Sequence, residues 1–567
     1  MNKYSVYFSL VVCFLLSPLF SEGKNLQELE IAFAKDNYDI VHSATFQNMR
    51  GFIAHHKYAV NYESKAPKRT FYVEGNAYQM GYLMGMMAEK DVAVMTNEFI
   101  DNVLLSFIKV DVDPKKIPVI WGVLMDILKN ETKRVLRDMS KEYINEMKGI
   151  EAGCKAANPE TKVTFNRLLM LNSGFDTLLS NFYALNQLWD KYPKLSVKDL
   201  DIPIMCNAFS VFGKATKDGK HYFGRDFMFP PGDAFEYTAS MVIYRPSDKR
   251  LPIVSVTAPG FVGSIAAMNS NGVAMGVDMV PSGGCDNNRP GINSLMMVRS
   301  VMHSGSDVNK AVKQVVKTQR GVSWLYMIAD GQNDRSVVLE TGKSTRKLDA
   351  IAFPPDELKW LALLPDADFL KRFENQKHQK GLMVRWNDYK YPQKFQEFNN
   401  DLFWYHGKKI NSKAWGERGF INRKHSGTNC PEAFYFSPQR EEKDDVLIMT
   451  NHYVTPSMRL CAMNPMTIEI ARNKANEVQW RYDELNEQIL KNYGNIDAEK
   501  ALELIDFLSP ERKHPEFYKN NQKSSDGKTQ RIRGSVSLFD LKDKTVKTKF
   551  GFYADDWITV TLPNYVD

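Results

Sequence analysis

Hydrophobic and polar residues follow two different rhythms along this chain, and the change comes near residue 204. Before that point, apolar residues tend to recur three or four positions apart, as they do on one face of a helix. After it, short runs of apolar and β-branched residues are separated by turn sequences such as Asp218-Gly219 and Asn271-Gly272. The pattern predicts a helix-rich first part and a second part built mainly from strands.

The first part is expected to be helical almost throughout. An amphipathic pattern covers residues 25–64, and residues 70–160 are predicted to be mostly helical, with helices over 78–94, 103–108 and 120–139. A helix, a loop and a second helix are expected within 143–176. Small residues four positions apart, Gly81 and Gly85, indicate close packing of one helix on another.

The second part is expected to form sheets covered by helices. Predicted strands cover residues 206–212, 221–227, 239–245, 253–257, 263–268, 273–279, 323–329, 336–340, 445–451, 535–539 and 557–562, and predicted helices cover 292–302, 307–317, 466–493 and 498–508. Residues 343–440 show weak periodicity and are interpreted as an insertion. This order of elements indicates an α+β fold in which helices cover sheets.

The first 22 residues have the pattern of a secretory signal peptide. A lysine near the start is followed by an apolar run, and small and polar residues come at its end. The run is short for a membrane span, and no other window reaches the length that a spanning helix requires. We expect an exported protein whose mature form has no membrane span.

Charge and cysteine content narrow the candidate functions. The formal net charge of +7 over 567 residues comes without an arginine-rich run, so nucleic acid is not a favoured partner. No Cys-x-x-Cys pair is present and the ten histidines are scattered, so neither a metal nor another cofactor is expected. Removal of the signal peptide leaves five cysteines, an odd number, which points to one unpaired thiol in an exported protein.

Cys206 is the cysteine with the most informative position, because it stands at the head of a predicted strand. If the bond after Met205 were cut, Cys206 would carry both a thiol and a free α-amine. An α-amine has a pKa near roughly 8, so it can act as the base for its own side chain. The alternative is an ordinary buried cysteine, which the stretch alone does not exclude.

Six strings in order support the nucleophile interpretation. They are GNAYQMGYLMG at 75–85, EMKGIEAG at 146–153, CNAFSVFGKATKDGKHYFGRDF at 206–227, GSIAAMNSNGVAMGVD at 263–278, VLIMTNHY at 446–453 and WRYDEL at 480–485. Together they resemble the N-terminal-nucleophile hydrolases, and specifically the peptidase C45 family of acyl-coenzyme A:6-aminopenicillanic acid acyltransferase relatives. The resemblance covers most of residues 70–565.

The resemblance implies a fold, a processing step and a reaction. The fold is a four-layer αββα sandwich with a helical N-terminal pro-segment, residues 23–205, and a catalytic chain, residues 206–567. The chain would cut itself between Met205 and Cys206, and the two fragments would stay together. The thiol would then attack a linear amide of a small or lipid-like acyl substrate, form a thioester, and pass the acyl group to water or an amine. The acyl group and its acceptor stay open.

The resemblance also implies roles for other residues. Arg225 would orient the nucleophile, Asn451 would help form an oxyanion hole, and Arg481 would lie at the rim of the site, although an exposed helix arginine is an equal alternative. The family's aspartate that holds the α-amine falls at Met228 here, which is a departure. Either Asp226 or Asp278 could replace it; alternatively, Asp226 forms a salt bridge with Arg225 or a lysine at the end of the hairpin.

Two other functions remain open at this stage. One is a lipid acyl hydrolase of the phospholipase-B-like kind, and the other is a catalytically inactive relative that binds a ligand or another protein. The departure at Met228 and the insertion at 343–440 keep the second alternative open. A papain-like protease is disfavoured, because its Cys-Gly-Ser-Cys-Trp type of signature is absent.

Overall fold

A ten-stranded sheet forms the centre of the molecule. The computed structural model describes residues 24–103, 118–191, 205–228, 233–280, 291–343, 381–390, 421–424, 431–434, 443–455, 458, 478–507 and 531–566. The strand order of the large sheet follows the chain: β1 (Tyr38–Phe46), β2 (Met49–Val60), β3 (Pro67–Gly75), β6 (Ser240–Pro246), β7 (Ile253–Thr257), β8 (Ala266–Asn269), β9 (Val273–Met279), β10 (Trp324–Asp330), β11 (Arg335–Thr341) and β12 (Leu382–Trp386). Its neighbours pair antiparallel except for β3 and β6, which run parallel.

A second sheet has six antiparallel strands. Its order is β15 (Val446–Thr450), β4 (Met205–Val211), β5 (Tyr222–Met228), β16 (Arg531–Asp540), β17 (Thr545–Phe552) and β18 (Ile558–Thr561). The two central strands, β4 and β5, both contact β9 of the large sheet. The two sheets therefore face each other where the predicted nucleophile lies. A separate two-stranded ribbon is formed by β13 (Ile421–Lys424) and β14 (Pro431–Phe434).

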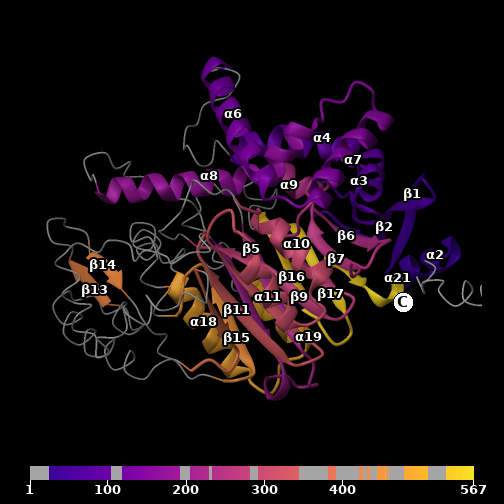
Figure 1. The fold of residues 1–567 in the computed structure, drawn as a ribbon. Helices are drawn as coiled ribbons and strands as arrows, with labels where there is room; N and C mark the ends of the chain where they lie inside the picture. Colours follow the sequence, from indigo (N-terminus) through magenta and orange to yellow (C-terminus); the bar gives the residue numbers. More distant parts are fainter. Residues whose placement is uncertain are drawn as a thin grey trace, which may run out of the picture.

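Helices pack on both sheets (Figure 1). On the large sheet α10 (Ser294–Ser304) contacts β8 and β9, and α11 (Val308–Lys317) contacts β10 and β11. On the smaller sheet α18 (Val478–Lys491) contacts β15, and α19 (Ala498–Phe507) contacts β5 and β16. The apolar core follows this arrangement: one cluster fills the large sheet and its surroundings, and a second lies between the small sheet and its helices. The architecture is mixed α and β, as the sequence pattern indicates.

The expectation that residues 25–64 are helical is wrong. Only α2 (Leu26–Lys35) is a helix there, and β1, β2 and β3 follow it. His55 and His56, which fall in the segment expected to be helical, lie in the middle of β2. The N-terminal chain is therefore not a purely helical pro-segment, since it supplies three strands to the large sheet.

The remaining helices of the first part agree well with the periodic pattern. They are α3 (Ala77–Met87), α4 (Glu89–Val94), the π-helix η1 (Met95–Phe99), α6 (Pro118–Lys133), the 3-10 turn η3 (Arg134–Arg137), α7 (Lys141–Ala157) and α8 (Phe165–Lys191). The close helix packing predicted from glycines is confirmed: a Cβ on Gly81 would lie 2.1 Å from the carbonyl oxygen of Glu146 in α7. Any side chain at Gly81 would force α3 and α7 apart.

Elements predicted after residue 204 agree with the structure to within a few residues, but the prediction is incomplete. Strands β13, β14 and β17 and the short helices α9 (Asp233–Thr238) and α21 (Pro563–Val566) were not predicted. Leu382–Trp386, in the region interpreted as an insertion, pairs with β11 as the last strand of the large sheet. The short 3-10 turn η5 (Gly213–Ala215) completes the fold. The predicted signal peptide, the helix at 103–108, residues 466–477 and most of 343–440 lie outside the described residues.

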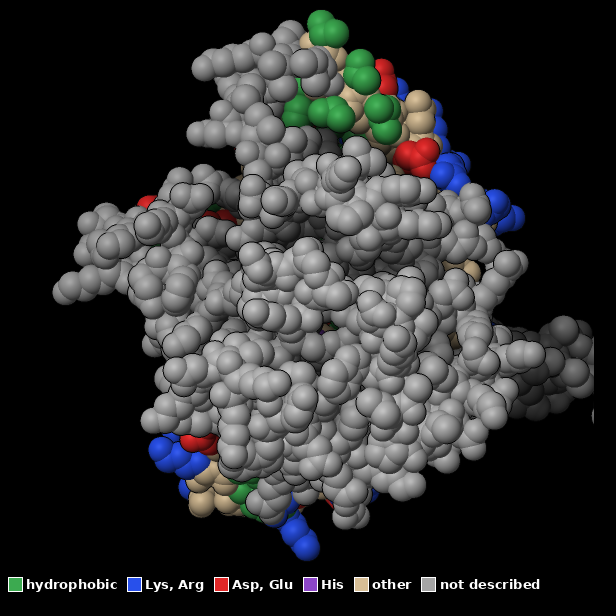
Figure 2. Space-filling view, turned by 90° about the vertical axis from the view of Figure 1, so that its left-hand side faces the viewer, with side chains coloured by type: hydrophobic (Ala, Val, Ile, Leu, Met, Phe, Trp, Pro, Cys, Tyr) green, Lys and Arg blue, Asp and Glu red, His purple; other side chains and the backbone are tan. Residues whose placement is uncertain are grey.

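Helix α6 carries exposed apolar side chains at a spacing of four residues. Val119, Val123 and Ile127 have exposed fractions of 79%, 56% and 55%. This spacing places them on one face of the helix. Figure 2 shows hydrophobic side chains gathered at the top of the molecule, where Figure 1 places α6. No described helix of the chain is long and apolar enough to cross a membrane.

Candidate active site

Cys206 lies at the beginning of a central strand of the small sheet. It is the second residue of β4, between β5 and β15, and it pairs with Phe227 in the ladder. Its side chain faces the large sheet and is 2% exposed. The hairpin that joins β4 to β5 turns at Gly219, whose φ of +69° favours glycine. The prediction of a cysteine at the head of a strand is therefore confirmed.

Three hydrogen bonds fix the nitrogen, the carbonyl and the thiol of Cys206. Its N–H donates to Asn451 Oδ1 at 2.8 Å, and its carbonyl oxygen accepts from the Arg481 guanidinium at 2.6 Å. Its Sγ lies 3.4 Å from the carbonyl oxygen of Met228, to which the thiol donates. Both groups that an N-terminal nucleophile needs, nitrogen and sulfur, are thus held in one buried place.

Arg481 reaches the site from α18, on the helix side of the small sheet. Its guanidinium also donates to Asn207 Oδ1 at 2.6 Å and to Asn451 Oδ1 at 2.9 Å. Asn207 in turn donates to Asp226 Oδ2 at 3.2 Å. Arg481 is fully buried, so the alternative of an exposed helix arginine is wrong. These side chains lie on the face of β4 and β5 opposite to the thiol, because neighbouring strand residues point to opposite faces.

Arg225 and Asp278 form the part of the site between the two sheets. The Arg225 guanidinium lies 2.8 Å from Asp278 Oδ1, and both side chains are fully buried. Arg225 also donates to the carbonyl oxygens of Asn207 and Asp226. Space for it comes from Gly276 in β9, where a Cβ would lie 2.8 Å from Arg225 Cδ. The pair therefore joins β5 to β9 directly beside the thiol.

The environment sets the protonation of this site. Burial, and then the Asp278 charge, raise the pKa of the Cys206 thiol from 9.0 to about 11, against the opposing influence of Arg225. Burial also raises the pKa of Asp278 from 3.8 to about 6, although Arg225 and Arg481 act to lower it. At neutral pH the intact chain holds a protonated thiol, so the nucleophile needs a base before it can react.

The raised pKa of Asp278 predicts a pH-dependent stability difference between the wild type and Asp278→Asn. Because the folded pKa exceeds the unfolded value, this carboxyl favours folding most below pH 3.8, and the contribution is lost as pH rises through 6. At 1.36 kcal/mol per pKa unit, the loss is about 3 kcal/mol. Between pH 3.8 and 6 the free energy of unfolding of the variant should therefore gain about that much relative to wild type. Denaturant titrations of both proteins across this range test it, and parallel pH profiles would contradict it.

A network that the sequence did not reveal positions Asn451. Its Nδ2 donates to the carbonyl oxygen of Met279 at 2.8 Å. The segment after it is anchored on Glu340, whose carboxylate accepts from the N–H groups of Val454 and Thr455 and from Arg385. Nothing in the sequence around Glu340 or Arg385 indicates this role, because the partners come from strands more than 40 residues apart. Asn207, the direct neighbour of the nucleophile, was also missed.

The structure brings together all six side chains that the sequence singled out. They are Cys206, Arg225, Asp226, Asp278, Asn451 and Arg481. The Asp226 carboxylate does not pair with Arg225 as the alternative proposed, since Arg225 pairs with Asp278. Met228 takes part through its carbonyl oxygen, while its side chain packs in the apolar cluster below α18 and α19. Their catalytic roles stay predictions.

Among the described residues, Cys206 and Cys154 are free thiols, and no group of three or more histidine, cysteine or acidic side chains is arranged to hold a metal ion. Cys13, Cys285, Cys430 and Cys461 lie outside the described residues. A cavity in the described part lies elsewhere, between α6, α8 and α10, and Cys206 does not line it.

Fold and site together define a mixed α and β protein with a buried cysteine centre between two sheets. No protein-family model matches the chain. An uncharacterized protein of Archaeoglobus fulgidus (strain ATCC 49558 / DSM 4304 / JCM 9628 / NBRC 100126 / VC-16) is 29% identical over 490 residues, which are 86% of this chain and 65% of that protein. The chain thus spans slightly less than two thirds of the length of this relative.

Solved structures of hydrolases show a low similarity to this chain. A mutant and a variant of conjugated bile acid hydrolase from Clostridium perfringens show TM-scores of 0.28 and 0.30 at 13% and 11% identity, covering 61% and 63% of this chain and 89% and 93% of theirs. A Caenorhabditis elegans ortholog of N-acylethanolamine-hydrolyzing acid amidase shows a TM-score of 0.20 at 15% identity, covering 24% of this chain and 59% of its own. At these TM-scores the similarity has no weight for the assignment below.

Proposed function

We propose that this chain is an exported cysteine hydrolase of the N-terminal-nucleophile type, similar to the peptidase C45 family, with the four-layer αββα arrangement of that class. It cuts itself before Cys206 and then cleaves a linear amide through a thioester on that residue. The observation that carries the proposal is the joint placement of the Cys206 nitrogen, on Asn451 Oδ1 at 2.8 Å, and the Cys206 thiol, beside Arg225 and Asp278.

The processing step balances with water alone. The Cys206 sulfur adds to the carbonyl carbon of Met205, the peptide C–N bond breaks, and the thiol proton goes to the departing nitrogen. Water then hydrolyses the thioester: one of its hydrogens goes to the sulfur, its oxygen becomes part of the carboxylate on Met205, and the remaining proton goes to solvent. The scissile bond lies within β4, where Met205 pairs with Met228, the residue whose carbonyl oxygen contacts the thiol.

The new α-amine then supplies the missing base. With an ordinary pKa near roughly 8, it accepts the thiol proton, and the thiolate attacks the carbonyl carbon of the amide. The amine part of the substrate leaves with a proton, and water or another amine then releases the acyl group from the sulfur. The second hydrogen of Asn451 Nδ2 is a candidate donor to the developing oxyanion, a kind of contact that contributes roughly 10²–10³ in rate.

Strand pairing supports the retention of the N-terminal chain after cleavage. β3 precedes Cys206 and β6 follows it, and the two pair in register from Thr70 with Met241 to Gly75 with Pro246. Both strands belong to one continuous ten-stranded sheet. Separating the fragments would expose the edges of β3 and β6, so the two chains are expected to stay associated.

Terminal sequencing of the purified, exported protein tests the proposal. We expect two co-purifying fragments, one beginning Cys-Asn-Ala-Phe, and release of fatty acid from an N-acyl amide but not from a phospholipid ester. Release from the ester alone would favour the lipid acyl hydrolase instead. A single uncut chain without hydrolytic activity would favour the ligand-binding alternative and would refute autoproteolysis.

A further inference from the structure

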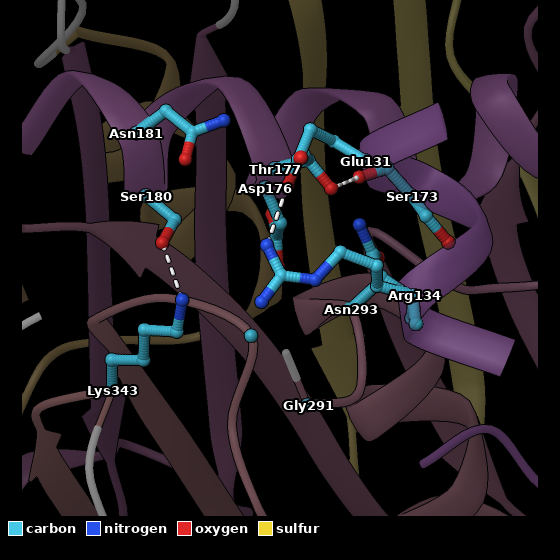
Figure 3. A pocket seen from close by; sticks show the side chains of 12 residues that line it. Glu131, Arg134, Ser173, Asp176, Thr177, Ser180, Asn181, Gly291, Asn293 and Lys343 are labelled. Carbon is cyan, nitrogen blue, oxygen red and sulfur yellow. Dashed lines mark hydrogen bonds and ion pairs between the residues drawn. The ribbon is translucent and has the colours of Figure 1, made fainter. Parts of the chain in front are cut away.

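The cavity between α6, α8 and the N-terminus of α10 has features of a binding site. It encloses about 400 Å³, including the part that is open to solvent. Figure 3 shows its polar lining, in which the Arg134 guanidinium and the Lys343 ammonium group reach in from opposite sides. Asp176 of the lining lies beside Trp324 of β10. Trp324 pairs with Met279 of β9, whose carbonyl oxygen accepts from Asn451 of the thiol site, so β9 and β10 connect the two places.

The carboxylates of the lining already accept hydrogen bonds from neighbouring groups. Glu131 accepts from Arg134 at 2.7 Å. Asp176 accepts from the N–H and the hydroxyl of Ser294 at 2.7 and 3.1 Å. Burial raises the pKa of Asp176 to about 7, so it carries less than a full negative charge at neutral pH. Among the described residues of the lining, the two cations, Arg134 and Lys343, therefore lie with two carboxylates whose oxygens already accept hydrogen bonds.

The side-chain amide of Asn293 has a fixed orientation in the lining. This residue is 5% exposed, and its Oδ1 accepts from Leu295 N–H at 2.8 Å as the N-cap of α10. The oxygen is thus committed to the helix, and Nδ2 is turned into the cavity beside Arg134 (Figure 3). The Ser173 hydroxyl is also buried in the lining and has no hydrogen-bond partner in the described part of the chain. Such donors are complementary to an acceptor that brings negative charge.

We propose that this cavity binds a compact oxyanion, a carboxylate or a phosphate group, between Arg134, Lys343 and Asn293. Lys343 Nζ donates to Ser180 Oγ at 2.5 Å, which directs the ammonium group toward α8 and the cavity. The amino end of α10 adds a favourable partial positive charge. The anion is either part of the amide substrate or a separate small molecule, and both share the same recognition chemistry.

Asn293→Asp is the decisive variant, because aspartate caps a helix as well as asparagine does. It keeps the acceptor for Leu295 N–H but replaces the amide donor with a carboxylate oxygen. In thermal-denaturation titrations of the full chain, acetate and inorganic phosphate should each stabilise the wild type saturably, against chloride at equal ionic strength. Asn293→Asp should weaken the binding of the effective anion at least about tenfold.

The matched control is Asn25→Asp, the same exchange at the N-cap of α2, which does not line the cavity. It should bind the anions as the wild type does, and Arg134→Gln should weaken them. A wild type without saturable stabilisation by either anion, or an Asn293→Asp protein that binds them unchanged, would overturn the proposal. The melting temperature without anion shows that each variant is folded.

A second experiment identifies the source of the anion, and this experiment rests on the proposed function. The substrates are a fatty acylglycine and the matching fatty acyl ethanolamide, which differ in the charge of the leaving amine. A raised KM of Asn293→Asp for the acylglycine alone places the anion on the substrate, whereas unchanged KM values assign the cavity to a separate anion. If the wild type cleaves neither, the proposed function fails on these substrates, and the acetate and phosphate titrations still decide the cavity.

Discussion

Replacing Cys206 with alanine is expected to leave the chain in one piece and without amide hydrolysis. In the proposed mechanism, the substitution removes the sulfur that attacks the carbonyl of Met205 and, after the cut, the carbonyl of the substrate. Removal of a covalent nucleophile costs on the order of 10⁶-fold in rate in a hydrolase that depends on it. Intact mass of the purified protein and an assay with an N-acyl amide measure both effects. The fold should survive, because only one buried atom is lost.

Cys154→Ala is the matched control for this experiment. Cys154 is also a free, fully buried cysteine, in α7, and burial raises the pKa of its thiol to about 12. This variant should be cut and active like the wild type. Cys206→Ser keeps a hydroxyl nucleophile and should alter activity without the total loss seen for alanine. A Cys206→Ala chain that still splits before residue 206 would show that a foreign protease makes the cut.

Cys206 was singled out by its place at the head of a predicted strand, and the other site residues were singled out by the family resemblance; most of them lie at fixed points of regular elements. Cys206 lies at the start of a strand, Arg225 and Asp226 lie in the next strand of the same hairpin, and Asn451 directly follows a third. Alternation along β5 also explains what the structure does with Met228. The Met228 side chain lies on the same face of β5 as Asp226. That face is turned toward α18 and α19, away from the thiol and Asp278.

Asp278 and Asp226 therefore do different work around the nucleophile. Asp278 neutralises Arg225 between the sheets and raises the thiol pKa, whereas Asp226 holds Asn207 on the helix side. The Cys206 nitrogen lies on Asn451, so neither carboxylate holds it in the intact chain. The aspartate that the resemblance would place at position 228 thus has no direct substitute in the intact chain.

The N-terminal strands escaped prediction for a physical reason. β1 is an edge strand whose residues are mostly exposed, so its side chains do not show the clean alternation of a half-buried strand. The available sequence signal is the asparagine of Gln47-Asn48. In the structure these two residues form the turn between β1 and β2, with φ values of +50° and +64°. Two such residues in a row are typical of a type I′ hairpin turn, for which asparagine is well suited. β17, with the sequence TVKTKFGF, was also missed.

Arg225→Met is expected to be strongly destabilising, because it leaves Asp278 as an uncompensated charge in the core. Removing one partner of a buried ion pair costs about 3–5 kcal/mol of unfolding free energy. The double variant Arg225→Met/Asp278→Asn should recover most of this loss, since both charges are then gone. The single variants should move the pKa of the Cys206 thiol in opposite directions, up for Arg225→Met and down for Asp278→Asn. Denaturant unfolding and the ultraviolet absorbance of the thiolate against pH measure the two effects.

The chain offers a matched pair that separates stability from chemistry. Arg299 and Glu146 form another fully buried ion pair, with Arg299 Nη1 2.6 Å from Glu146 Oε1. The pair is far from the thiol in sequence, and Arg299 packs against Tyr244. Arg299→Met should destabilise the fold as Arg225→Met does, yet leave the thiol pKa and the cleavage before Cys206 unchanged in the folded protein. If both arginine variants moved the thiol pKa equally, Arg225 would act on Cys206 only through general loosening of the core. A shift of the thiol pKa that occurs only in the Arg225 and Asp278 variants would instead establish that this ion pair sets the ionisation of Cys206.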